Sequence, residues 1–481
     1  MMPPISTGTD ASAQQEPSAI EKLLAGTRSG YVEPEPAPEA EAEADQDSYA
    51  DSYGPLEPAI PETVEEAGVT STMIEQLIMK TLYFRSETLG RDLSLSLGLK
   101  FSVIEDLLDF LKRQHLIQVK KSLGMGAISA IYSLTESGRQ LARDYLDANQ
   151  YAGRVPVPLA QYTEFVHAQR RPESWLTPEM LKKAFEHMVV TPDLIAALGP
   201  AVNAGKSFLI YGQAGNGKTY LAEALFDLDD SPIFIPYAIE AQGMTIQLFD
   251  PLYHTPVEEI REESLLAFAA QPTHDMRWVR VRRPFIVTGG ELDLSMLDLS
   301  YNESSRYYDA PLQLKANNGI YLIDDFGRQK ATPAEILNRW IVPMERRVDY
   351  LTFKNGTKMH VPFECFLIFS SNLKPDMLGD EAFLRRIQYK MLMRNPSEEE
   401  FREIFIRFCE QVEIPFEPGL LDRFLVKHYR STGKKRRRCH PRDVLTHAVD
   451  LIRFERRMWK LTDEVLDHAF DTCFVRTDEE E

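Results

Sequence analysis

The stretch F-L-I-Y-G-Q-A-G-N-G-K-T, residues 208–219, decides how the rest of the chain is interpreted. Its apolar start predicts a short strand, and Y-L-A-E-A-L after Thr219 predicts a helix. Between them lies G-x-x-x-x-G-K-T, the Walker A pattern, whose glycines let backbone N–H groups turn toward phosphates at the positive end of a helix. Because strand, loop and helix follow in the required order, a phosphate-binding loop is favoured over an ordinary Gly-rich turn.

This loop predicts the contacts to a nucleoside triphosphate. Lys218 should reach the β- and γ-phosphates, and Thr219 should bind Mg²⁺. The expected nucleotide-binding residues of the loop are Gly212, Gly215, Asn216, Gly217, Lys218, Thr219 and Tyr220.

Two later apolar runs end in polar residues. I-Y-L-I, residues 320–323, is followed by Asp324 and Asp325, which is a Walker B pattern. Asp324 should hold the metal shell, and Asp325 should polarise the attacking water. A third strand, residues 366–369, runs into S-S-N, where Asn372 can orient that water against the γ-phosphate.

In this order the motifs resemble those of AAA+ ATPases, over roughly residues 180–475. Asn372 matches the sensor 1 position of that family. The segment D-E-A-F-L-R-R-I, residues 380–387, is similar to its arginine-finger box, which makes Arg385 and Arg386 the finger candidates. H-P-R-D-V-L, residues 440–445, is similar to the start of the sensor 2 helix, and Arg442 would then contact the nucleotide from the lid. Surface arginines on capped helices are the plainer alternative for both segments.

The resemblance implies an α/β P-loop core with a parallel sheet and a C-terminal helical lid. It also implies ATP and Mg²⁺ as cofactors and ATP hydrolysis as the activity. Because the fingers act on a neighbouring subunit, it implies a homo-oligomeric ring, with a hexamer expected, that remodels a protein client. This output rests on family analogy.

The chain departs from the family pattern in three places. Asp325 stands where a glutamate is usual, as also happens in DnaA- and DnaC-like members. Extra material separates the two Walker motifs, and residues 237–314 are expected to form an insertion. Residues 351–363 predict a hairpin around Asn355-Gly356, which resembles the pre-sensor-1 hairpin of MoxR-like, helix-insert AAA+ proteins. Lys354 and Lys358 of that hairpin are candidates for substrate contact.

Residues 69–150 predict a small α+β winged-helix domain, similar to MarR- and PadR-like regulators. Helical spacing begins near Met73, a second helix ends at Gly98, and Ser102 can cap a third helix. Two strands joined by Gly124-Met125-Gly126 follow, and Thr135 can cap a further helix. Acidic residues on the third helix oppose DNA, so a protein-interaction role is favoured over DNA binding.

The charge is concentrated at the N-terminus. Residues 1–68 contain 15 acidic and two basic residues, a net charge of −13, which leaves only −6 of the total of −19 for the rest. This segment is expected to be a disordered acidic tail. The folded part therefore lacks the positive balance of a general nucleic-acid binder. The basic run K-K-R-R-R, residues 434–438, is expected to be a solvated loop, with contact to phosphate, nucleic acid or the acidic tail as alternatives.

Composition narrows the class of protein further. At 43% hydrophobic residues the chain supports a sizeable core, and its longest apolar runs are too short to span a bilayer. No secretory signal is visible, and the four cysteines have neither zinc-ligand nor disulfide-framework spacing. These features predict a cytoplasmic protein.

The predicted domains are a tail at 1–68, a winged helix at 69–150 and a linker at 151–180. An ATPase core at 181–395, a lid at 396–476 and an acidic end at 477–481 follow. Two other functions stay open: a DNA-directed ATPase, either a regulator or a loader, and a nucleotide-gated binding module that barely hydrolyses ATP because of Asp325.

Overall fold

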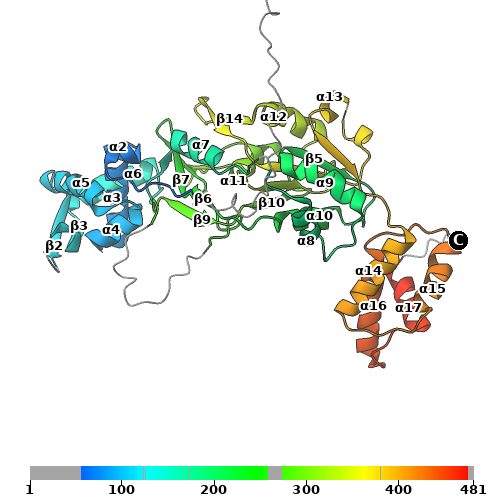
Figure 1. Ribbon diagram of the computed structural model, residues 1–481. Helices are drawn as coiled ribbons and strands as arrows, with labels where there is room; N and C mark the ends of the chain where they lie inside the picture. The colour runs from blue at the N-terminus through cyan, green and yellow to red at the C-terminus, as the bar shows by residue number, and fades with distance from the viewer. Residues whose placement is uncertain are drawn as a thin grey trace, which may run out of the picture. The chain divides into compact units, whose positions relative to one another are not determined.

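The computed structural model describes residues 56–122, 124, 126–172, 174–257, 273–379 and 381–474 (Figure 1). Most of the predicted acidic tail and all of the acidic C-terminal end therefore lie outside the described residues. The tail prediction extends too far, because residues 56–68 pack on the folded part. There α2 (Val64–Ala67) is capped by Thr63, Ala67 is fully buried, and the Arg277 guanidinium donates to the Ala67 carbonyl over 2.6 Å.

An α+β module follows. Its elements are α3 (Ser71–Arg85), β1 (Glu87–Leu89), α4 (Gly90–Leu97), α5 (Phe101–Arg113), β2 (Ile117–Ser122), β3 (Ala130–Leu134) and α6 (Glu136–Ala148). The strands form an antiparallel sheet in the order β1-β3-β2. Thr135 caps α6 as the sequence predicts, but Lys100 rather than Ser102 is the N-cap of α5. Gly138 is required because a Cβ there would lie 1.9 Å from the Leu116 carbonyl oxygen.

Lys80 of α3 is buried in this module, and no carboxylate among the described residues pairs with it. Its Nζ donates to the Tyr151 carbonyl oxygen over 3.3 Å, and burial lowers its pKa from 10.5 to about 8. The folded state therefore disfavours the ammonium form, and this cost is present below pH 8 and lost as the pH rises to 10.5.

We expect Lys80→Met to stabilise the chain at pH 7 by roughly 1–3 kcal/mol, because the charge and its desolvation cost are removed together. The gain should shrink at pH 10. Thermal melts of the full chain at the two pH values measure it, with the exposed Lys120→Met on β2 as the control. A lower melting temperature for Lys80→Met at pH 7 would contradict this account.

The predicted linker at 151–180 is wrong over residues 157–168, which belong to the fold. Residues 157–158 form β4 (Val157–Pro158), which pairs in parallel with β7 (Ala238–Ala241), and α7 (Leu159–Ala168) follows at once. Tyr162 of α7 is 1% exposed, and its hydroxyl accepts from Asn317 Nδ2 over 2.9 Å. The Pro-rich sequence V-P-V-P-L suggested a spacer, but its apolar residues are buried against strands that lie far ahead in the sequence.

The central sheet has five parallel strands in the order β10-β13-β16-β5-β17. They are β5 (Ser207–Tyr211), β10 (Phe285–Thr288), β13 (Ile320–Ile323), β16 (Phe366–Ser371) and β17 (Tyr389–Leu392). Alternate residues of β5, β13 and β16 face two separate apolar clusters. Trp340 of α12 (Pro333–Arg346) packs in one cluster, and α9 (Pro192–Ala204) and α10 (Lys218–Phe226) pack in the other.

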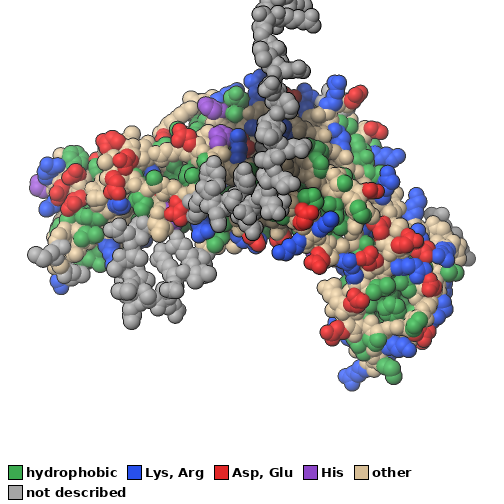
Figure 2. All heavy atoms as spheres, in the orientation of Figure 1, with side chains coloured by type: hydrophobic (Ala, Val, Ile, Leu, Met, Phe, Trp, Pro, Cys, Tyr) green, Lys and Arg blue, Asp and Glu red, His purple; other side chains and the backbone are tan. Residues whose placement is uncertain are grey.

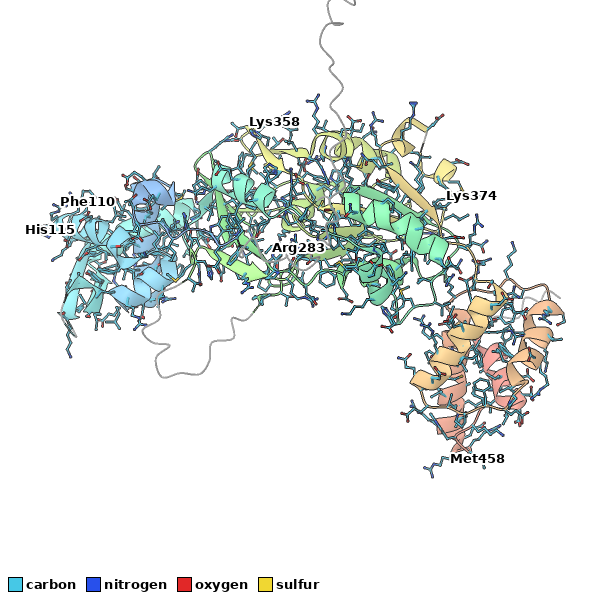
Figure 3. The ribbon with its side chains drawn as sticks, viewed as in Figure 1. Phe110, His115, Arg283, Lys358, Lys374 and Met458 are labelled. Atoms are coloured by element: carbon cyan, nitrogen blue, oxygen red, sulfur yellow. The ribbon has the colours of Figure 1, made fainter. Side chains whose placement is uncertain are left out.

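With helices on both faces of a parallel sheet and a helical C-terminal region, the predicted α/β fold with a parallel sheet core and C-terminal helices is confirmed. Arg283 shows how the segment before β10 is fixed in this region (Figure 3). Its guanidinium donates to the Asn318 carbonyl over 2.8 Å and pairs with Asp229.

The expected insertion at 237–314 is drawn too broadly, because β10 inside it belongs to the central sheet. The added strands are β6 (Ile233–Pro236), β7, β8 (Met244–Gln247), β9 (Trp278–Val281), β11 (Ser300–Tyr301) and β12 (Tyr308–Asp309). Four of them join β4 in a second sheet, β11-β12-β8-β7-β4, and β6 pairs with β9. The short helix α11 (Leu312–Lys315) then leads to β13.

The predicted hairpin is formed by β14 (Val348–Thr352) and β15 (Lys358–Pro362). Lys354 at its turn is paired with Glu303, and its ammonium lies 4.8 Å from the centre of the Tyr301 ring. Lys358 is exposed on β15 (Figure 3).

Residues 398–473 form the helical lid. It consists of α14 (Glu398–Gln411), α15 (Leu420–Leu425), a π-helical turn (Val426–Arg430), α16 (His440–Glu455) and α17 (Asp463–Cys473). These helices enclose an apolar core that includes Phe401, Phe405 and Phe424. Among the described residues, none of the helices combines the length and apolarity needed to cross a membrane.

Candidate nucleotide site

The P-loop connects β5 to α10 and has the backbone that its glycines allow. Gly212, Gly215 and Gly217 have φ values of 150°, 79° and 84°. A Cβ at Gly212 would lie 2.3 Å from the Met393 carbonyl oxygen. The backbone N–H groups of residues 213–217 donate no hydrogen bond to another described residue. These free donors fit the oxygens of a phosphate chain.

Lys218, at the start of α10, is buried inside the loop. Its Nζ donates to the carbonyl oxygens of Gly212 over 3.0 Å and Gln213 over 3.2 Å, and to Asn372 Oδ1 over 2.7 Å. Burial lowers the pKa of Lys218, whereas Asp324 and Asp325 favour its charged form. The ammonium is thus held where the loop and the end of β16 meet.

Two carboxylates face this lysine from the end of β13. Asp324 Oδ2 accepts from the Thr219 hydroxyl over 3.0 Å, which joins the two expected metal ligands. Asp325 Oδ1 accepts from Asn372 Nδ2 over 2.6 Å. Hydroxyl and carboxylate oxygens are the ligands that Mg²⁺ prefers, so this donor set fits a metal ion bound together with phosphates.

Asp325 is held in a left-handed conformation, with a φ of 51°. Gln329, which the sequence analysis did not identify, fixes this turn: its Nε2 donates to the carbonyl oxygens of Asp324 over 2.9 Å and Asp325 over 3.3 Å. Its Oε1 accepts from the Gly327 N–H over 2.8 Å. Gln329 therefore fixes the backbone that carries the Asp325 side chain, although it follows the motif rather than forming part of it.

The finger candidates lie apart from this cluster. Arg385 is exposed after the short helix α13 (Glu381–Leu384), and Arg386 Nε lies 3.0 Å from Glu345 Oε1 of α12. Both line a cavity of about 520 Å³ with residues that include Lys206 and Arg347. The Ser207 hydroxyl donates to the Arg386 carbonyl oxygen over 3.1 Å, so Arg386 lies at the start of β5 rather than at the end that leads into the P-loop.

Of the remaining expected contacts, Tyr220 and Arg442 are directed elsewhere. The Tyr220 ring is 50% exposed and packs edge-on against His187. The Arg442 guanidinium is exposed and donates to its neighbour Asp443, and neither its hydrogen bonds nor its ion pair reaches the P-loop.

The lid contacts the P-loop through the residues just before Arg442. The Cys439 N–H donates to the Gly215 carbonyl oxygen over 2.8 Å, and the Arg438 N–H donates to Asn216 Oδ1 over 3.4 Å. Asn216 Nδ2 in turn donates to Asn395 Oδ1 over 2.9 Å. A Cβ at Gly215 would lie 2.6 Å from Cys439 Sγ and would displace it, and the φ of 79° also favours glycine there.

Arg437 is the lid cation next to this contact. Its Nη1 lies 3.5 Å from Asn395 Oδ1, and its charge is among those that lower the pKa of Lys218. The basic run was visible in the sequence, but its alignment with the P-loop depends on lid packing that the sequence does not show.

Comparisons with known proteins identify one matching family model. It is described as a domain of unknown function (DUF8689) and covers residues 397–472, which are the lid. No curated protein matches the chain.

Several solved structures are similar to this chain at low sequence identity. NtrX from Brucella abortus aligns with a TM-score of 0.35 and 11% identity, over 68% of this chain and 59% of its own. The same protein in complex with ADP aligns with a TM-score of 0.36 and 12% identity, over 72% of this chain and 63% of its own. The Thermotoga maritima RuvB Holliday junction branch migration motor aligns with a TM-score of 0.32 and 13% identity, over 63% of this chain and 72% of its own. The chain thus spans about three fifths of the NtrX chains.

Proposed function

We propose that the chain binds MgATP and hydrolyses it. The observation that carries this proposal is two neighbouring hydrogen-bonded links: Lys218 and Asp325 share Asn372, and Thr219 donates to Asp324. P-loop, Walker B and sensor 1 side chains thereby meet at one edge of the sheet. A Gly-rich turn without a nucleotide would not need these three strands to end in one polar cluster.

Each residue has a role that follows from its position. The N–H groups of residues 213–217 and the Lys218 ammonium bind the phosphates, and Thr219 and Asp324 hold the metal. A bound Mg²⁺ supplies charge neutralisation on the phosphate oxygens. Asp325 accepts a proton from water, and Asn372 orients the Asp325 carboxylate through its amide.

Arg437 takes the place that the sequence analysis gave to Arg442. It lies beside the P-loop contact of the lid, whereas Arg442 is exposed and paired with Asp443. The lid thereby supplies a second cation near Lys218, and an anion between the two would relieve their repulsion.

The position of Arg385 and Arg386 supports a ring in which one subunit completes the site of the next. In this proposal the assembly is a homo-oligomer, expected to be a hexamer with a MoxR-like, helix-insert core, and it remodels a protein client. The α3–α6 module is its winged helix and docks the client.

A mixing experiment tests the ring. Lys218→Ala and Arg386→Ala are each expected to reduce turnover strongly. The first change inactivates the subunit's own P-loop, and the second removes the finger that completes the neighbouring subunit's site. When the two purified variants are mixed, subunits with an intact P-loop meet neighbours with an intact finger. Steady-state phosphate release should then recover to a measurable fraction of the wild-type rate. The mixtures are made at a constant total protein concentration. If they release phosphate only at the sum of the two separate rates while the wild-type protein is active, action in trans is contradicted.

A DNA-directed ATPase is the second candidate, since β2 carries exposed Lys120 and Lys121. Against it, α5 exposes Glu105, Asp106 and Asp109, and acidic and basic side chains are intermixed on the face shown in Figure 2. Duplex binding that weakens steeply with salt would favour this candidate over protein remodelling.

A further inference from the structure

The basic run at residues 434–438 is neutralised unevenly. Lys434 lies 3.6 Å from the centre of the Phe474 ring, and Lys435 is exposed. Arg436 is paired with Glu398, and Arg438 is paired with Glu400. Arg437, between them, forms no ion pair with a described residue, and its guanidinium has only the Asn395 amide oxygen at 3.5 Å.

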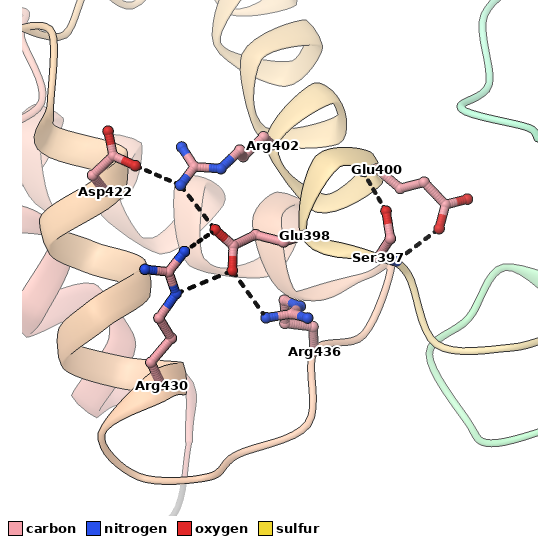
Figure 4. A network of polar contacts seen from close by, with 7 residues as sticks. All are labelled: Ser397, Glu398, Glu400, Arg402, Asp422, Arg430 and Arg436. Atoms are coloured by element: carbon pink, nitrogen blue, oxygen red, sulfur yellow. Dashed lines mark hydrogen bonds and ion pairs between the residues drawn. The ribbon is translucent and has the colours of Figure 1, made fainter.

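Glu398 is the centre of a network at the first turn of α14 (Figure 4). Its Oε1 accepts from Arg402 over 2.9 Å and from Arg430, and its Oε2 accepts from Arg430 over 3.2 Å and from Arg436 over 3.4 Å. Only 19% of the Glu398 side chain is exposed. Its hydrogen bonds with Arg430 and Arg402 hold the pKa of the Glu398 carboxyl below its ordinary value of 4.5. The carboxylate therefore remains charged and ties the basic run to α14.

Glu400 holds the other neighbour of Arg437. Its Oε1 is paired with Arg438, while its Oε2 accepts from the Ser397 N–H over 2.7 Å in the capping box of α14 (Figure 4). Arg438 Nη1 also donates to the Val189 carbonyl oxygen over 2.6 Å, which links the lid to the segment before α9. The backbone on both sides of Arg437 is thus fixed by one turn of one helix.

We propose that Glu398 and Glu400 are positioning residues, which hold Arg436 and Arg438 so that Arg437 faces the polyphosphate of a nucleotide in the P-loop. Carboxylates neutralise the two flanking arginines, whereas the middle arginine keeps its charge for an anionic ligand. Only Arg437 of the three is therefore available to bind phosphate. The first turn of α14 thereby sets nucleotide affinity without contacting the nucleotide. This inference rests on the proposed function.

A double-mutant cycle on the full chain tests it, with a fluorescent ATP analogue and Mg²⁺ as the probe. Glu398→Gln should weaken binding about 5- to 10-fold, and Arg437→Ala should weaken it by about the same factor. In the Arg437→Ala background, Glu398→Gln should change the affinity by less than about 2-fold, because the residue through which it acts is gone. Arg436→Gln, which removes the other end of the pair, should repeat the Glu398→Gln result.

Glu399→Gln is the matched control. Glu399 lies between the two positioning residues on the same turn, is exposed, and forms no ion pair with a described residue. Its loss should leave affinity within about 2-fold, as should Arg442→Ala. The inference is overturned if Glu398→Gln weakens binding equally in both backgrounds, or if Glu399→Gln has the same effect as Glu398→Gln. If the wild-type chain binds no ATP analogue, the proposed function fails as well, and that outcome is recognised before any variant is compared.

Discussion

Replacing Lys218 with alanine should reduce steady-state phosphate release at least about 100-fold. The ammonium is buried where the P-loop carbonyls and Asn372 converge, so its loss removes the cation that is held inside the loop. Removal of a preorganised charge from such a site costs about 3–4 kcal/mol of transition-state stabilisation, which corresponds to a factor of 10²–10³. Affinity for MgATP should fall in parallel, because Lys218 contacts the phosphates before and during hydrolysis.

Lys182→Ala provides the comparison for this variant, since Lys182 is an exposed lysine on α8 (Pro178–Ala184). It should keep wild-type turnover. If Lys218→Ala retains more than about a tenth of the wild-type rate while its melting temperature is unchanged, the P-loop assignment is wrong.

Asp325→Asn should separate binding from hydrolysis. The amide keeps the shape of the carboxylate and can still meet Asn372, but it accepts no proton from water. We expect turnover to fall about 100-fold and the affinity for MgATP to stay within about 3-fold of wild type. Single-turnover phosphate release and equilibrium binding, measured on one preparation, test both parts.

Asp324→Asn is the comparison variant in this experiment, because it changes the adjacent carboxylate. Asp324 is bonded to Thr219 and belongs to the metal site, so its loss should weaken binding in a Mg²⁺-dependent way. Equal turnover in wild type and Asp325→Asn would remove Asp325 from the chemistry. Turnover near background in both proteins would instead favour a nucleotide-gated binding module with little hydrolysis.

The motifs predicted the fold class because they are local. A strand, a Gly-rich turn and a helix start are contiguous in residues 208–219, and the carboxyl ends of parallel strands meet at one edge of a sheet. The grouping of Asp324, Asp325 and Asn372 around Lys218 follows from that rule. The metal and water roles of these residues stay predictions.

Features that depend on distant packing were not predictable in this way. The sequence places β10 within the insertion, because its pairing partner β13 lies 35 residues further along the chain and no local signal marks that pairing. The V-P-V-P-L segment has the composition of a spacer, yet β4 pairs with β7. Arg442 matched a helix-start motif, whereas the lid contact at Gly215 is made by the preceding residues, aligned through the distant Glu398 and Glu400.

Calorimetric titration of the full chain with MgATP tests the central claim most directly. The account predicts one binding site per chain, with no detectable heat of binding for Lys218→Ala under the same conditions. A wild-type chain that binds no MgATP, or a Lys218→Ala variant that binds it as tightly as wild type, would contradict the claim.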